Sequence, residues 1–94
     1  MTQLQGKVAF ITGGSKGIGF GIAKVLLQKG IHVAITSRSL ESAQKAANQL
    51  SVFAADSAKV LAFKADVRDY QQQQDAVKAT ESTLGSIDIV IANA

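Results

Sequence analysis

Four glycines fall within seven residues of the stretch TGGSKGIG, which occupies positions 12–19: Gly13, Gly14, Gly17 and Gly19. An apolar segment precedes them, and a segment with helical periodicity follows. Glycine lets a backbone approach a ligand without a Cβ in the way. The start of a helix offers unpaired N–H groups and a partial positive charge. The combination predicts a pyrophosphate-binding loop, with a glycine-rich turn that binds no ligand as the alternative.

The segments around this loop alternate between short apolar runs and amphipathic ones. We expect strands at 7–11, 32–36, 59–65 and 87–94. We expect helices at 17–29, 40–50 and 70–84, of which the first is closed by Gly30 and the others begin after the N-caps Ser39 and Asp69. The residues expected to form the buried face of the first helix are Ile18, Ile22, Val25 and Leu26.

The β-α-β-α-β-α-β order predicts an α/β fold, a Rossmann-type doubly wound parallel sheet with strand order 3-2-1-4. The first, second and fourth strands are continuous apolar runs, which indicates that helices cover both faces of the sheet. In this order the strand at 87–94 would be an open apolar edge, which complete domains cover. We therefore expect residues 1–94 to be one nucleotide-binding domain that is incomplete, because the chain ends at the tip of the fourth strand.

The glycine spacing distinguishes between families of nucleotide-binding loops. The general dinucleotide motif G-x-G-x-x-G fails because Ile22 stands at its third glycine, and no P-loop motif can be written here. The pattern T-G-x-x-x-G-x-G resembles the cofactor loop of the short-chain dehydrogenase/reductase family, in its shorter subtype. Further matches follow in the family's order: Ser37-Arg38, Asp66-Val67 and Ala92-Asn93-Ala94, the last standing where the family has N-N-A-G.

The resemblance covers the whole chain and implies roles for individual residues. The cofactor loop would comprise Gly13, Ser15, Lys16, Gly17, Ile18 and Gly19. Asp66 would accept a hydrogen bond from the adenine amino group, with the backbone of Val67 beside the ring, and Asn93 would line the adenosine ribose. Asp66 could instead cap the following helix, and Asn93 could instead tie the last strand to its neighbours. We expect Thr12 to bond backbone near that strand, and Gly19 and Gly21 to allow close contact of helix and strand.

The residues after the second strand bear on the choice of cofactor. An acid at this point holds the ribose 2′-hydroxyl of NAD, and it would repel a 2′-phosphate. Here Ser37 replaces the acid, Arg38 follows, and Lys16 belongs to the glycine loop. Two cations without an acid favour NADP(H), with NAD(H) possible. The alternative is that Arg38 is a solvated surface charge.

The family's catalytic Ser and Tyr-x-x-x-Lys pair have no counterpart here. The sequence has one tyrosine, Tyr70, and Gln74 stands where the lysine would be. The resemblance therefore implies that this chain holds no catalytic residue and is inactive alone. The complete protein would be an NADPH-dependent oxidoreductase and a homo-tetramer. It would act on a small carbonyl or alcohol substrate and resemble the 3-oxoacyl-acyl-carrier-protein reductases. The alternative is a non-catalytic, truncated nucleotide-binding fragment.

The amino-acid composition bears on which kinds of partner and site to expect. Hydrophobic residues make up 47% and charged residues 18%, as in globular domains. The ten Lys and Arg residues that give a net charge of +3 are scattered, so we expect no nucleic-acid partner. No apolar run approaches the roughly 20 residues of a membrane span. With no cysteine and a single histidine, His32, we expect no metal site, and a cytoplasmic location fits.

Overall fold

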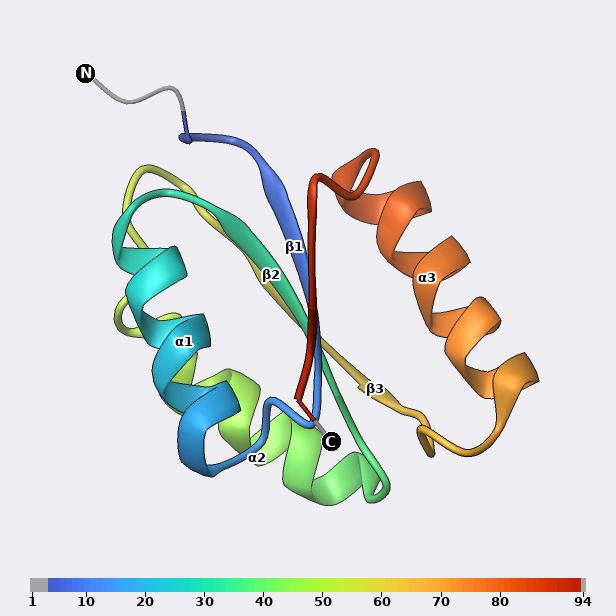
Figure 1. The fold of residues 1–94 in the computed structure, drawn as a ribbon. Helices are drawn as coiled ribbons and strands as arrows, with labels where there is room; N and C mark the ends of the chain where they lie inside the picture. Colours follow the sequence, from blue (N-terminus) through green and yellow to red (C-terminus); the bar gives the residue numbers. More distant parts are fainter. Residues whose placement is uncertain (1–3, 94) are drawn as a thin grey trace.

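The computed structural model describes residues 4–93, which form a parallel sheet flanked by helices (Figure 1). The strands are β1 (Val8–Thr12), β2 (His32–Ser37), β3 (Val60–Lys64) and β4 (Ile89–Ala92). The helices are α1 (Gly17–Gln28), α2 (Leu40–Ser51) and α3 (Tyr70–Leu84). The sheet order is β3-β2-β1-β4 and every pairing is parallel, which confirms the predicted fold class and strand order.

Helices cover the two faces of the sheet unequally. Figure 1 shows α1 and α2 on one face and α3 on the other. The larger core lies under α1 and α2, where Leu27 and Leu50 pack against Ile11 and Ile35. β1 and β2 are buried on both faces, as their continuous apolar runs predict. The apolar run of β4 predicts the same and is wrong there, because α3 packs on β1, β2 and β3 and leaves Val90 68% exposed.

The predicted boundaries are correct to within two residues. The fourth strand starts at Ile89 rather than at 87, and the preceding Asp88 uses its side chain to bond the start of β1. Its backbone N–H donates to the Val8 carbonyl (2.8 Å), and its Oδ2 accepts from the Val8 N–H (2.9 Å). Ala94, the last residue of that predicted strand, lies outside the described residues.

The predicted caps of the second and third helices are confirmed. Ser39 Oγ accepts from the backbone N–H of Ser42 at 3.2 Å, and Asp69 Oδ1 accepts from that of Gln72 at 3.1 Å. Each side chain thereby satisfies one of the N–H groups that the first turn of a helix leaves unpaired.

The predicted buried face of α1 is partly wrong. The fully buried positions are Gly19, Ala23 and Leu27, at a spacing of four residues. By contrast, Ile18 is 75% and Val25 is 49% exposed. Small residues bring the helix axis close to the sheet, and glycine and alanine add little to an apolar pattern. The apolar periodicity therefore predicts a buried face made of larger side chains, which lie beside the residues that contact the sheet.

Candidate functional site

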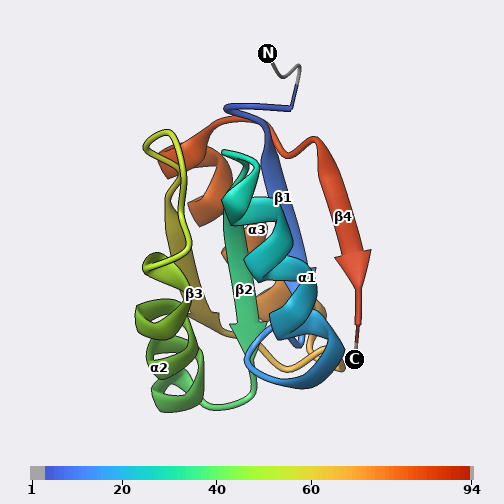
Figure 2. The ribbon, with the colours of Figure 1, turned by 90° about the vertical axis from the view of Figure 1, so that its left-hand side faces the viewer.

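A pocket of about 490 Å³ opens at the carboxyl ends of the strands. Figure 2 shows that the ends of β1 and β4 and the start of α1 meet at this edge of the sheet. The strand order reverses between β1 and β4, and ligands of doubly wound sheets bind at such switch points. The residues that line the pocket are Gly13, Ser15, Lys16, Ser37, Arg38, Ala65, Asp66, Val67, Arg68 and Asn93.

Eight of the eleven residues predicted for the cofactor site line this pocket, although they come from four separate stretches of sequence. The other three lie in the first turn of α1. Gly17 and Ile18 are exposed there, and Gly19 is buried beneath Asn93. Two further residues that no sequence motif marks, Ala65 and Arg68, also line the pocket.

Thr36, near the end of β2, fixes the glycine loop and was not predicted from the sequence. Its Oγ1 accepts from the Gly13 N–H at 3.4 Å, and its carbonyl accepts from the Gly14 N–H at 3.2 Å. Thr36 is fully buried. The sequence does carry one signal for this role: the Thr36 hydroxyl follows apolar residues that a buried strand would contain. A buried hydroxyl needs a hydrogen-bond partner.

Two glycines allow the loop and helix to approach the sheet closely. A Cβ on Gly14 would lie 2.5 Å from Ile35 Cγ2, and one on Gly19 would lie 2.6 Å from the Gly13 carbonyl oxygen. Gly19 does allow a close contact, but its partners are the glycine loop and Asn93, which follow β1 and β4, rather than the strands themselves. The predicted contact is wrong for Gly21, which is exposed and whose Cβ would meet nothing within 4 Å. Gly21 lies two residues further along the helix and so points to another side.

The N-terminus of α1 lacks the kind of cap that α2 and α3 have. Its N-cap residue, Lys16, has an extended backbone (φ −161°) and no side-chain hydrogen bond to the first turn. Gly13 and Gly17 take positive φ values of 68° and 65° on either side of it. The first-turn N–H groups of α1 are thus left without a side-chain cap and are available to an anion.

Ser37 joins the glycine loop to the start of α2. Its Oγ accepts from the Ser15 hydroxyl at 3.5 Å and from the Ser39 backbone N–H at 3.4 Å. Arg38 and Lys16 are both exposed and both line the pocket. The positions predicted to meet a 2′-phosphate therefore combine one neutral hydroxyl with two positive charges.

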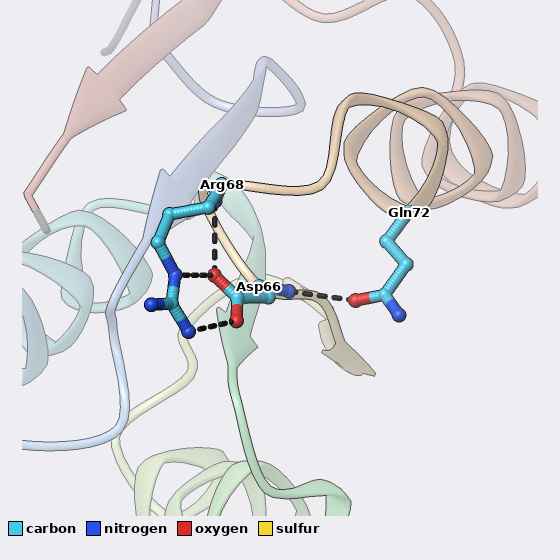
Figure 3. A network of polar contacts seen from close by, with 3 residues as sticks. All are labelled: Asp66, Arg68 and Gln72. Atoms are coloured by element: carbon cyan, nitrogen blue, oxygen red, sulfur yellow. Dashed lines mark hydrogen bonds and ion pairs between the residues drawn. The ribbon is translucent and has the colours of Figure 1, made fainter.

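Asp66 and Arg68 form a bidentate ion pair in the loop after β3 (Figure 3). Arg68 Nη2 donates to Oδ2 at 2.8 Å, Nε donates to Oδ1 at 3.1 Å, and the Arg68 backbone N–H donates to Oδ1 at 2.9 Å. The side-chain bonds, followed by the backbone bond, hold the pKa of Asp66 well below its usual range, and the positive charge of Arg38 acts in the same direction. The carboxylate also raises the pKa of Arg68. The cap of α3 is Asp69, so the alternative role of Asp66 as the helix cap is wrong.

Asn93 ties the end of β4 to the glycine loop. Its backbone N–H donates to Thr12 Oγ1 at 3.0 Å, and its side-chain Nδ2 donates to the Gly13 carbonyl at 3.1 Å. The predicted role of Thr12 is confirmed, as is the structural alternative for Asn93. Its contact with a ribose remains a prediction.

Other kinds of site find little support within residues 4–93. No group of three or more His, Asp or Glu side chains there could hold a metal ion. His32 Nδ1 accepts the Lys59 backbone N–H at 2.9 Å, which is a structural contact. None of the described helices has the length and apolar character needed to cross a bilayer.

Comparison with known proteins identifies the family. Residues 7–94 match the family described as short chain dehydrogenase. This chain belongs to the short-chain dehydrogenase family. The peroxisomal 2,4-dienoyl-CoA reductase of Danio rerio is 43% identical over 91 residues, which cover 97% of this chain and 30% of that protein.

Solved structures of short-chain dehydrogenases share the fold. A variant short-chain dehydrogenase/reductase from Serratia marcescens is 42% identical with a TM-score of 0.86, covering 99% of this chain and 37% of the other. L-Sorbose reductase from Gluconobacter frateurii, solved with NADPH and L-sorbose, is 34% identical with a TM-score of 0.87. The match covers 97% of this chain and 34% of the reductase. The chain thus spans about a third of the length of each of these short-chain dehydrogenases.

Proposed function

We propose that this chain is the NADP(H)-binding part of a short-chain dehydrogenase/reductase. The complete protein would transfer a hydride between the nicotinamide ring and a small carbonyl or alcohol substrate. The observation that supports the proposal best is a single pocket that combines the glycine loop, up to the N-cap residue Lys16 of α1, with the residues that follow β2, β3 and β4. The hydride chemistry belongs to the cofactor, and the residues of this chain bind and orient it.

Each part of the dinucleotide has a matching set of groups in the pocket or in the first turn of α1. The glycine loop and the first-turn N–H groups of α1 suit the pyrophosphate, because they offer donors and a positive dipole end with no side chain in the way. Asp66 and the Val67 backbone suit the adenine, and Asn93 suits the adenosine ribose. The pocket contains one carboxylate, Asp66, and it lies on the side assigned to the adenine.

We propose a preference for NADP(H) over NAD(H). A 2′-phosphate carries close to two negative charges near neutral pH. Arg38 can bind it through charge-assisted hydrogen bonds, and Lys16 adds a second cation. Ser37 contributes because it is neutral. Both cations are exposed, so salt screens their attraction, but a preference of about 30-fold is still expected.

The groups that transfer protons are proposed to lie outside this chain. Tyr70 is 74% exposed at the start of α3, does not line the pocket, and accepts a hydrogen bond from Gln74 at 2.9 Å. We therefore propose that the 94 residues alone are inactive. The complete enzyme is proposed to be a cytoplasmic homo-tetramer, with the 3-oxoacyl-acyl-carrier-protein reductases as its nearest functional type.

The test uses the complete protein that carries this sequence. Calorimetry measures its affinity for NADPH, and the loss of NADPH absorbance with simple ketones and acetoacetyl thioesters measures turnover. The proposal expects binding and carbonyl-dependent oxidation, with no oxidation by the 94-residue chain alone. Binding without turnover on any carbonyl or alcohol would favour the alternative, a non-catalytic nucleotide-binding protein. The absence of binding would refute both.

A further inference from the structure

Arg68 holds the carboxylate of Asp66 more completely than a typical surface ion pair does. The carboxylate accepts three hydrogen bonds from this one residue, two of them from the side chain and one from the backbone. On the other side, the backbone N–H of Asp66 donates to Gln72 Oε1 at 2.8 Å, from the first turns of α3. Figure 3 shows Asp66 between these two partners. The orientation of its side chain is therefore restrained from both directions.

The count of acceptor sites shows what Asp66 has left to offer. An ionised carboxylate has about four lone-pair sites. Oδ1 uses two of them, for the backbone N–H and Nε of Arg68, and Oδ2 uses one, for Nη2. The remaining site belongs to Oδ2. Asp66 lines the pocket and its side chain is 26% exposed, so a donor on a ligand in the pocket can approach the carboxylate.

We propose that Arg68 is a positioning residue for purine recognition. Its three hydrogen bonds to the carboxylate hold Asp66 turned so that the last Oδ2 site accepts a hydrogen bond from the exocyclic amino group of adenine. A 6-oxo purine would place an acceptor oxygen against the same carboxylate. Arg68 thereby sets the preference for adenine over hypoxanthine. The inference rests on the proposed function, because it takes the pocket to be the dinucleotide site.

Arg68 also lines the pocket alongside Lys16 and Arg38, so a role as a third phosphate-binding cation must be distinguished from positioning. The contacts favour positioning. Two guanidinium nitrogens of Arg68 are engaged by the carboxylate, which also offsets its charge. Removing Arg68 should therefore alter the choice of base and leave the NADPH-to-NADH preference unchanged.

The experiment compares dissociation constants of the complete protein for three ligands: NADPH, NADH and the reduced hypoxanthine analogue of NADPH. The variants are Arg68→Gln, Arg68→Lys, Asp66→Asn and the double variant Asp66→Asn/Arg68→Gln. Lys78→Gln is the matched control, because it removes one positive charge from an exposed site on α3 outside the pocket. Arg68→Lys keeps the charge but loses the planar fork.

Wild type should prefer NADPH over its hypoxanthine analogue by about 10-fold. Arg68→Gln and Arg68→Lys should each reduce that ratio by about threefold to fivefold, while the NADPH-to-NADH ratio stays within about twofold of wild type. Lys78→Gln should change neither ratio. Asp66→Asn should abolish the base preference, and adding Arg68→Gln to it should have no further effect, because Arg68 acts through Asp66.

Three results would overturn the inference while leaving the proposed function intact. One is an equal loss of affinity for all three ligands in Arg68→Gln, which indicates a merely structural role. Another is a fall in the NADPH-to-NADH ratio, which indicates a phosphate-binding role. The third is a wild type that binds NADPH and its hypoxanthine analogue equally. If wild type binds none of the ligands, the proposed function fails and this inference fails with it.

Discussion

The two walls of the pocket are built on different physical principles. The wall formed by the glycine loop before α1 is held by buried contacts. Thr36 anchors the loop, and the contacts at Gly14 and Gly19 leave no room for a Cβ. The wall formed by the β3–α3 loop is held by exposed polar contacts, mainly the pair between Asp66 and Arg68, whose side chains are 26% and 76% exposed.

The difference indicates what each wall can contribute. Close packing defines a shape, and interiors tolerate small changes in volume poorly. The glycine-loop wall should therefore be rigid, and substitutions that change its shape should be costly. Exposed ion pairs contribute little to stability and are screened by salt. The β3–α3 wall should therefore affect which base binds more than whether the domain folds.

The largest expected effect follows from filling the close contacts. Gly14→Ala and Gly19→Ala should each lower the free energy of unfolding by about 1–3 kcal/mol, because the new methyl groups would overlap Ile35 and the Gly13 carbonyl. Gly21→Ala is the control on the same helix. It has open space and should raise stability by up to about 1 kcal/mol through helix propensity. Urea denaturation of the complete protein measures all three. Equal effects at the three positions would contradict the packing account.

The next effect concerns the choice of cofactor. Ser37→Asp together with Arg38→Ala removes a cation and adds repulsion toward a 2′-phosphate, so the preference should change from NADPH to NADH. Aspartate at 37 can still accept from Ser15 and Ser39, which should preserve the loop. Calorimetry on both cofactors measures the ratio, and Lys29→Gln, an exposed charge outside the pocket, is the control. An unchanged ratio in the double variant would remove Ser37 and Arg38 from the cofactor assignment.

A smaller effect is expected from the buried hydroxyl that anchors the loop. Thr36→Val keeps the shape but leaves the Gly13 N–H without its partner, at a cost of about 1 kcal/mol in stability. It should also weaken dinucleotide binding, because the loop loses an anchor. Thr80→Val is the matched control. Thr80 is equally buried, but its hydroxyl donates to Ala76 within α3, so its loss should not weaken binding. Equal binding by wild type and Thr36→Val would show that the hydroxyl does not shape the site.

The smallest effect is expected in the β3–α3 wall, where the contribution of the Asp66–Arg68 pair to stability should depend on pH. The pKa of Asp66 is depressed, so its pairing with Arg68 stabilises the fold above the unfolded pKa of about 4 and is lost as the pH falls below that. The stability difference between wild type and Asp66→Asn should therefore be greatest at neutral pH. It should shrink in acid and in high salt. A difference that grows on acidification would have the wrong sign for this pair.

The fold could be predicted well because its signals are local. Apolar runs, the caps Ser39 and Asp69, and the alternation of strands and helices each depend on a few adjacent residues. The contact face of α1 could not be predicted, because Gly19 and Ala23 pack by being small and give a weak apolar signal.

The candidate site was predictable only where a motif marks it. The resemblance gave Gly13, Ser37, Asp66 and Asn93, which the fold brings to one pocket. Thr36 and Arg68 were missed because their roles depend on partners that only the folded chain determines. The hydroxyl of Thr36 meets a loop 23 residues away, and the guanidinium of Arg68 folds back onto Asp66.

The central claim is that the pocket binds a nicotinamide dinucleotide and recognises its 2′-phosphate. The most direct test is the pair of dissociation constants of the wild-type complete protein for NADPH and NADH, measured at low and high ionic strength. We expect both cofactors to bind, NADPH about 30-fold more tightly at low salt, and we expect salt to weaken the binding of NADPH more than that of NADH. Equal affinity for the two cofactors at low salt would contradict the roles of Arg38 and Lys16, and failure to bind either would contradict the site itself.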